Sequence, residues 1–483
     1  MNYKLISRYV GLALSFESAF MFLSVLISVL NGMDSSFAPL LISAVVTLLV
    51  GQFPLIFVRK SEDISISDGF VITVFSWVLS CVFGMFPYLL WGEEFTIPNA
   101  WFESVSGYTA TGATILSDVE TLPKGLLFYR SSTHFLGGLG VVAFMLMVLP
   151  SMSTFRMKMF KMEISALSHD NYQYRTKQSL KIIIFVYLSI AVASFVSLIL
   201  AGMEPFDAVN HAMSITATGG FSTKNQSLAT FDSFPIELVT MVFMLISGIH
   251  FGITYKFFTT GSWKVFKNPV LRFYLLLLGI SVMIIASDLL ISSTIPVSSW
   301  SEAIRQSAFQ VISISTSTGL ATQDTTLWPA LCILILLFLS LMGACSGSTT
   351  GGLKVDRVWI LFKSIKTQIQ RQLHPNAVIQ TRVGNEVIDA TNASSVAIFI
   401  SMYLSMVFIC ALILSATGLD FMDSFTASFA SMGNIGPAFG SCGSLDNFGH
   451  IPSFAKLILT VEMLFGRVEI YPFLLITSVF RRR

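Results

Sequence analysis

The sequence predicts an all-α polytopic membrane protein, and three observations lead to this fold class. Of its 483 residues, 54% are hydrophobic and only 12% are charged, whereas soluble domains carry roughly 25% charged residues. Apolar stretches of about 20 residues, the length at which a helix crosses a bilayer, recur along the whole chain. Basic residues gather in alternate connections between these stretches, which is the pattern of loops that stay in the cytoplasm. The chain therefore belongs in a membrane.

Ten apolar stretches are candidate spans, and the first has no small-residue cleavage site after it, so we expect it to be a retained helix. The stretches are 9–30, 37–58, 70–91, 126–149, 182–200, 238–258, 271–291, 327–342, 395–416 and 454–480. With both termini in the cytoplasm, 23 of the 29 basic residues fall on the cytoplasmic side. This bias predicts a multi-pass protein with both ends inside.

Four outer segments between spans are too long and too apolar for plain loops. They are 98–112, 205–219, 301–319 and 423–436, and they end alike, in Thr-Ala-Thr-Gly twice, Thr-Ser-Thr-Gly, and Gly-Asn-Ile-Gly. Backbone that re-enters a membrane is tolerated only where protein buries it or where it lines a watery cavity. The final glycines, Gly112, Gly219, Gly319 and Gly436, are 100 to 117 residues apart. This self-similarity predicts one span–pore loop–span unit used four times around one central pore.

The repeats divide the chain into five parts. Residues 1–66 form two N-terminal transmembrane helices, followed by pore repeats at 67–158, 159–266, 267–386 and 387–483. The third repeat contains an intramembrane loop at 343–352, where glycine, serine and threonine interrupt what would otherwise be one long helix. This loop is not a phosphate-binding loop, because Leu353 stands where that motif needs lysine.

The repeated turn suits a cation filter. Rings of backbone carbonyl oxygens replace the hydration shell of an ion without a fixed charge that would trap it, and glycine supplies the positive φ that aims them. Asn99, Asp207 and Asp423 are predicted N-caps of short helices whose negative C-terminal ends point at the ion. The predicted filter consists of Ala110, Thr111, Gly112, Ala217, Thr218, Gly219, Ser317, Thr318, Gly319, Asn434, Ile435 and Gly436.

The four motifs, at 106–114, 214–221, 315–322 and 431–437, resemble those of the Trk/Ktr/HKT superfamily, and specifically the TrkH-type bacterial potassium uptake proteins. The resemblance covers the whole chain. It implies potassium as the transported ion, four repeats around one pore, a bacterial inner-membrane location and a homodimer. It also implies a cytosolic TrkA-type regulatory ring, which would carry the nucleotide (ATP, ADP or NAD), with no cofactor on this chain. Sodium-preferring plant members carry serine at the position of Gly112, so the resemblance favours potassium, although Gly-Asn-Ile in the fourth loop predicts looser selectivity.

The resemblance also assigns a gate. Its residues are Gly343, Gly347, Ser348, Thr349, Thr350, Gly351, Gly352 and Arg467. Arg467 lies within the last predicted span, where a charge is costly and must face protein or water. A salt bridge to Glu462 or Glu469, or a side chain that reaches the interface, is the alternative to a place in the pore below the filter. A hydrogen bond from Arg467 to the loop would hold the gate shut.

Other functions have weaker support. No carboxylate pair or histidine cluster predicts an enzyme, and nothing predicts a nucleic-acid partner. A sodium- or proton-coupled secondary transporter remains the alternative, because broken helices are common in such proteins. The partner ring is expected to dock on a basic cytoplasmic surface that includes Lys158, Lys161, Lys264, Lys354 and Arg357.

Overall fold

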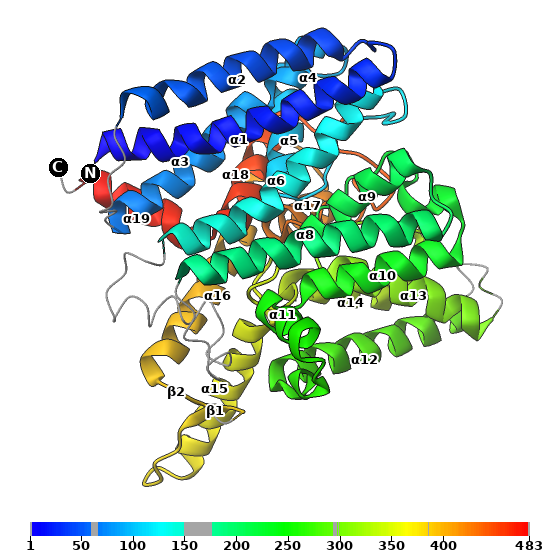
Figure 1. Ribbon diagram of the computed structural model, residues 1–483. Coiled ribbons are helices and arrows are strands. Elements are labelled where there is room, and N and C mark those ends of the chain that lie inside the picture. The colour runs from blue at the N-terminus through cyan, green and yellow to red at the C-terminus, as the bar shows by residue number, and fades with distance from the viewer. Residues whose placement is uncertain are drawn as a thin grey trace.

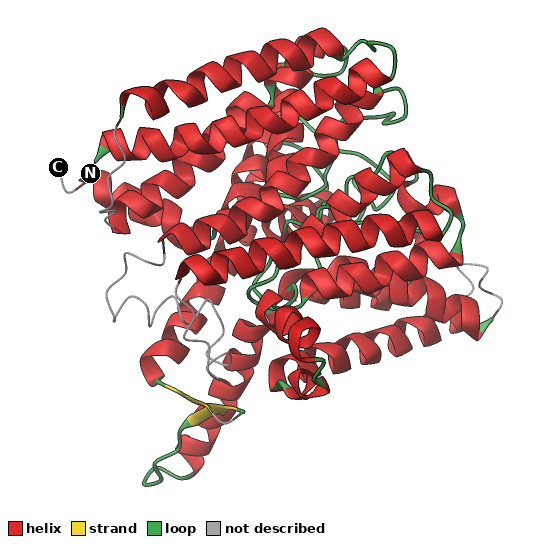
Figure 2. Ribbon diagram, viewed as in Figure 1, coloured by secondary structure: helices red, strands yellow, loops and turns green. Residues whose placement is uncertain are grey.

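The computed structural model describes residues 2–58, 66–148, 176–292, 297, 299–384 and 386–481. Figure 2 shows that this part of the chain is mostly helical. Its strands, β1 (Thr381–Val383) and β2 (Glu386–Ile388), form one antiparallel hairpin. The N-terminal end of α1 (Tyr3–Leu30) and the C-terminal end of α19 (Ile470–Arg481) lie at the same end of the molecule (Figure 1).

The two N-terminal helices form a closely packed pair. Helices α1 and α2 (Phe37–Phe57) lie side by side at one edge of the molecule (Figure 1). A side chain on Gly11 would overlap the carbonyl oxygen of Gly51, so these glycines set how closely the two backbones approach. Small residues serve the same purpose in other membrane helix pairs.

The four repeats share one order of elements: a long helix, a short helix that ends at the predicted filter turn, and a further helix. The first contains α3 (Ile66–Gly84), α4 (Phe86–Trp91), α5 (Ile97–Tyr108) and α6 (Lys124–Val148). The second contains α8 (Thr176–Leu200), α9 (Pro205–Ala217), η2 (Ser227–Phe231), α10 (Phe234–Gly248), α11 (Phe251–Thr260) and η3 (Trp263–Lys267). The third contains α12 (Pro269–Ile291), α13 (Trp300–Ser315), η4 (Thr325–Leu327), α14 (Ala330–Met342), α15 (Val355–Leu373) and the hairpin. The fourth contains α16 (Ala390–Ala416), α17 (Phe421–Gly433), α18 (Ser453–Val468) and α19. The predicted boundary at 158–159 lies outside the described residues.

Within the described residues, six helical segments are long and apolar enough to cross a membrane, and two other predicted spans are broken. The predicted span 238–258 bends by 108° between α10 and α11, where His250 leaves the helical conformation and accepts a hydrogen bond from the backbone of Gly252. The predicted span 454–480 breaks at Glu469, which has a positive φ of 67° and pairs with Arg357. Continuous hydropathy did not reveal these breaks, because residues of the third repeat also hold them: the carbonyl of Gly347 accepts from the backbone of Phe251, and Arg357 binds Glu469.

Large apolar side chains are exposed on the outside of the molecule, and polar side chains are buried in its centre among apolar ones. Ile56, Leu200 and Ile291 are exposed by 73%, 82% and 83% of their surface. The filter turns, by contrast, are buried and rich in threonine and serine. This is the arrangement expected when lipid surrounds a protein that has a polar interior.

Candidate ion-conducting site

All four short helices α5, α9, α13 and α17 end in the same backbone turn. The residue after each helix, or one position further, is left-handed, and a glycine with φ between +73° and +89° follows two residues later. These pairs are Ala110 and Gly112, Thr218 and Gly220, Ser317 and Gly319, and Asn434 and Gly436. The residue between the members of each pair donates its backbone N–H to a carbonyl five residues earlier, at 2.9 to 3.0 Å.

The four turns close into one ring. A Cβ atom on each ring glycine would lie closer than 3.0 Å to a carbonyl oxygen of the next repeat. The glycine and the residue whose carbonyl oxygen its Cβ would overlap are, in order, Gly112 and Gly219, Gly220 and Thr318, Gly319 and Ile435, and Gly436 and Thr111. The order returns to its start after four steps, so the repeats follow one another around a common axis with their backbones in contact.

The ring contains Gly220 where the sequence predicted Gly219. Gly219 holds the place of Thr111 in the first repeat, and a side chain on it would overlap the imidazole of His134 from α6. The Thr-Ala-Thr-Gly motif led to the wrong register because it repeats letter for letter. The spacing from the serine that starts the first two motifs was the available signal, since Ser106 lies six residues before Gly112 and Ser214 lies six residues before Gly220.

A cavity of about 70 Å³ lies against the ring, and all four ring glycines line it. Arg130, Lys224 and Asp446 also line it, so it has charged walls. Partial burial, together with the nearby carboxylate of Asp324, raises the pKa of Asp446 above the ordinary value of 3.8. The cavity opens the ring to the side that carries the loops after the short helices, and we refer to it as the vestibule.

The predicted loop 343–352 breaks the helix as expected, between α14 and α15, and it contacts the filter turns directly. Thr349 donates to the carbonyl oxygen of Thr216 at 3.2 Å, and its hydroxyl accepts from that of Thr218 at 3.3 Å. A side chain on Gly351 would overlap the carbonyl oxygen of Gly433. The loop therefore lies against the second and fourth filter turns.

The loop is fixed by bonds from several elements. Phe251 at the start of α11 donates its backbone N–H to the carbonyl of Gly347 at 3.1 Å. Asp356 accepts from the backbone of Ser346 at 2.6 Å, and Lys354 donates to the carbonyl of Thr350. Such contacts hold a glycine-rich segment in one conformation.

Arg467 points at this loop. It is 5% exposed, and its Nη1 donates to the carbonyl oxygen of Thr349 at 2.5 Å. Neither alternative ion pair forms, because Glu469 binds Arg357 at 2.8 Å and Glu462 accepts from Ser428 at 2.6 Å. The hydrogen bond that the sequence predicted between Arg467 and the loop is present.

The predicted N-caps are wrong. The caps are Thr96, Glu204 and Asp420, because the helices start three residues earlier than predicted. Asn99, Asp207 and Asp423 instead use their side chains to bind Lys456, Thr223 and Ser441, at 2.7 to 2.8 Å. They thus tie the first turn of each short helix to a segment of the outer surface.

Two residues of the predicted docking surface do not face outward. Lys354 turns back onto the loop, and Arg357 is 6% exposed and paired with Glu469. Lys158 and Lys161 lie outside the described residues, as does the side chain of Lys264. Helix α15 and the hairpin project from the helical body (Figure 1). They therefore offer a docking surface at another place than the predicted one.

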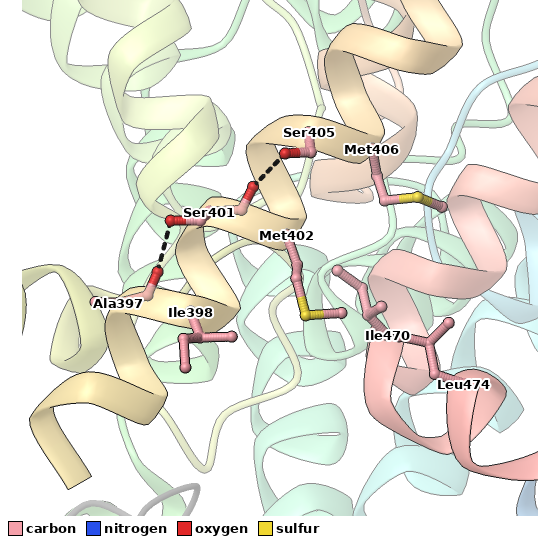
Figure 3. Close-up of a pocket in the computed structure, with 8 residues that line it drawn as sticks. All are labelled: Ala397, Ile398, Ser401, Met402, Ser405, Met406, Ile470 and Leu474. Carbon is pink, nitrogen blue, oxygen red and sulfur yellow. Dashed lines mark hydrogen bonds between the residues drawn. The ribbon is translucent and has the colours of Figure 1, made fainter. Parts of the chain in front are cut away.

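A second hollow is unrelated to the ring. An open groove of about 460 Å³ lies between α16 and α19 (Figure 3). Its serines, Ser401 and Ser405, donate to carbonyls of their own helix at 2.9 and 2.8 Å. The groove therefore offers an apolar surface and no free polar groups for an ion.

Residues 39–481 match the family model described as "Cation transport protein", TrkH. The chain belongs to the TrkH family. The Trk system potassium uptake protein TrkH of Vibrio parahaemolyticus is 34% identical over the full length of both chains, and TrkH of Escherichia coli K12 is 32% identical, also over the full length of both. The crystal structure of the potassium transporter TrkH from Vibrio parahaemolyticus matches the fold with a TM-score of 0.88 and 33% identity, covering 99% of this chain and 98% of that one. The all-α membrane fold predicted from the sequence is thus confirmed for this TrkH-family chain.

Proposed function

We propose that this protein conducts potassium across the bacterial inner membrane through the ring of Gly112, Gly220, Gly319 and Gly436. The observation that carries the proposal is the closed cycle of backbone contacts between the four repeats. Such a cycle places four sets of carbonyl oxygens around one axis, which is how a filter replaces the hydration shell of a cation. The naming of full-length relatives as potassium uptake proteins supports potassium as the ion.

The loop 343–352 and Arg467 form the gate in this proposal. The loop contacts the filter turns on the side away from the vestibule residues, and Arg467 holds it through the carbonyl of Thr349. A fixed positive charge at that place also opposes a passing cation. Opening then requires the hydrogen bond to break and the loop to move aside.

The assembly is part of the same proposal. Relatives named as components of a Trk system support a soluble partner, here a TrkA-type ring that carries the nucleotide in the cytosol. We further propose a homodimer with both termini of each chain in the cytoplasm. The projecting helix α15 follows directly after the loop in sequence, so a partner bound to it has a short mechanical route to the gate.

Current measurement on purified protein in planar bilayers tests this function. With potassium on one side and sodium on the other, we expect a reversal potential set by potassium. Gly112→Ser should lower the potassium preference, because its side chain would overlap the carbonyl oxygen of Gly219. The matched control is Gly92→Ser, since Gly92 has nearly the same φ but no atom within 4 Å of an added Cβ.

The same recordings distinguish a channel from a coupled secondary transporter. Gradients of sodium or protons that move the reversal potential at constant potassium would favour a secondary transporter, for which the broken helices α10–α11 and α18–α19 are the structural argument. If Gly92→Ser and Gly112→Ser lose selectivity equally, the ring is not the selectivity filter.

A further inference from the structure

A buried ion pair joins the first and second filter loops. Arg130 of α6 and Glu103 of α5 are 2.6 Å apart, and their side chains are 3% and 0% exposed. Glu103 also accepts from the hydroxyl of Thr114 at 3.0 Å and from the backbone N–H of Ile115 at 3.0 Å. The two donors, Thr114 and Ile115, lie two and three residues after Gly112. Glu103 therefore holds the segment that follows the first filter turn.

Arg130 reaches the second filter loop in two ways. Its Nη1 donates to the carbonyl oxygen of Ser222 at 3.0 Å, and its guanidinium carbon lies 3.5 Å from the centre of the Phe221 ring. Phe221 and Ser222 directly follow Gly220. Arginine combines a fork of donors with a flat face that stacks on aromatic rings, so one side chain can bind a carbonyl, a carboxylate and a ring at once.

Phe221 is held on its other side by His134. The two rings are nearly parallel, at 12°, with centres 3.9 Å apart. Arg130 and His134 are four residues apart on α6, so they lie on one face of the helix, and Phe221 fits between them. The imidazole also fills the place of the missing side chain at Gly219 and lies 3.3 Å from the hydroxyl of Ser214.

The other repeats lack this charge. The residue nine positions before the ring glycine is Glu103 in the first repeat, and His211, Gln310 and Ala427 in the others. His211 bonds the hydroxyl of Ser222 at 3.0 Å, and Gln310 donates to the carbonyl of Gln323 at 3.2 Å. Glu103, His211 and Gln310 therefore make different contacts at the same position of their repeats, Ala427 has no polar group there, and of the four only Glu103 forms an ion pair at this position.

We propose that Glu103, Arg130, Phe221 and His134 form a positioning clamp that sets the spacing between the first and second filter loops, and with it the preference for potassium over sodium. The proposal rests on the conducting role given to the ring. Sodium is the smaller ion, so a ring free to contract would bind it better, while a ring held open favours potassium. The clamp binds backbone groups of two neighbouring filter loops, Ile115 in the first and Ser222 in the second, and Glu103 neutralises the charge that Arg130 would otherwise place in the vestibule.

The permeability ratio of potassium to sodium, measured from reversal potentials in bilayers, tests the clamp. Arg130→Gln should lower the ratio about tenfold, which corresponds to a change of about 1.4 kcal/mol in relative ion binding. Arg130→Lys keeps the positive charge but lacks the fork of donors, so its permeability ratio should lie between those of the wild type and Arg130→Gln. Phe221→Leu should lower the ratio about threefold, because the ring contact with the guanidinium is lost.

An ion pair away from the filter provides the matched control. Arg305 binds Glu237 at 2.7 and 2.9 Å, joining α13 to α10 without a contact on a filter loop. The double variant Arg305→Gln, Glu237→Gln should keep the wild-type ratio. If it loses as much selectivity as Arg130→Gln, the effect is one of general stability and the clamp is refuted.

Folding is separated from positioning by a second double variant. Glu103→Gln with Arg130→Gln leaves no unpaired buried charge, which is the main reason that breaking such a pair destabilises a protein. We expect it to fold with a lowered ratio, and a wild-type ratio would overturn the proposal. If none of the three Arg130 variants folds, Phe221→Leu decides in the same way. A wild type that passes no potassium overturns the proposed function and the clamp together, whereas an unchanged ratio in the variants of a selective wild type overturns the clamp alone.

Discussion

Removal of the Arg467 side chain should open the path through the ring. In the structure its Nη1 donates to the carbonyl of Thr349, and among the described residues its Nε and Nη2 have no hydrogen-bond partner. The guanidinium therefore binds the closed loop by one charged hydrogen bond. Such bonds contribute about 1.5–3 kcal/mol, so Arg467→Ala should shift the ratio of open to closed protein by roughly 10- to 150-fold.

Single-channel recording measures this shift as open probability at fixed voltage and potassium concentration. Arg467→Lys is the matched variant, because it keeps the positive charge but replaces the planar fork by one flexible ammonium, and we expect an intermediate open probability. The potassium preference should stay that of the wild type in both variants, since the ring carbonyls are unchanged.

Two results would refute this reasoning. If Arg467→Ala folds and its open probability equals that of the wild type, the hydrogen bond to Thr349 does not hold a gate. If the variant conducts more but loses its potassium preference, Arg467 supports the filter itself. Thermal unfolding of both variants in detergent establishes that the comparison is between folded proteins.

Three further predictions follow from the loop and the outer surface. Deletion of Gly347–Gly351 should raise potassium flux in liposomes, and a folded variant that conducts less would make the loop a structural linker. Because the pKa of Asp446 is raised, its charge is lost at a higher pH than that of an ordinary aspartate; current should therefore fall as the outer solution is acidified, and Asp446→Asn should reduce this dependence at constant potassium. Burial alone would raise the pKa of Asp34, but hydrogen bonds from Ser28, Ser36 and the backbone of Gly125 lower it below 3.8. Its contribution to stability is then present above the unfolded-state pKa and lost as pH falls through the folded-state value, so Asp34→Asn should lower the unfolding temperature at pH 7 and have less effect near pH 3.

The vestibule connects these predictions to the clamp. Arg130 and Asp446 both line it, but they have opposite expected roles. Asp446 is exposed and can concentrate cations near the mouth, whereas the charge of Arg130 is neutralised by Glu103 at 2.6 Å. Substitution of Asp446 should therefore change conductance and leave the permeability ratio alone, and substitution of Arg130 should change the ratio.

The sequence by itself determined the membrane class, the four repeated turns and the break in the third repeat. These features depend on local properties: about 20 apolar residues span a bilayer, glycine adopts positive φ without strain, and a run of glycine, serine and threonine does not sustain a helix. The preference of glycine for positive φ also identified three of the four ring glycines, Gly112, Gly319 and Gly436. The contact of Arg467 with the loop was also foreseen, from the family resemblance.

Only the tertiary structure decided which glycine of the Gly219–Gly220 pair enters the ring. Both glycines satisfy the local rule, and the choice depends on His134 of α6, whose ring occupies the space beside Gly219. The breaks at His250 and Glu469 and the sandwich around Phe221 have the same origin. In each case the deciding partner is remote in sequence, and its effect is steric or electrostatic at a few ångströms. Hydropathy and motif spacing carry no information on such a contact, because neither records which side chain fills the space beside a backbone.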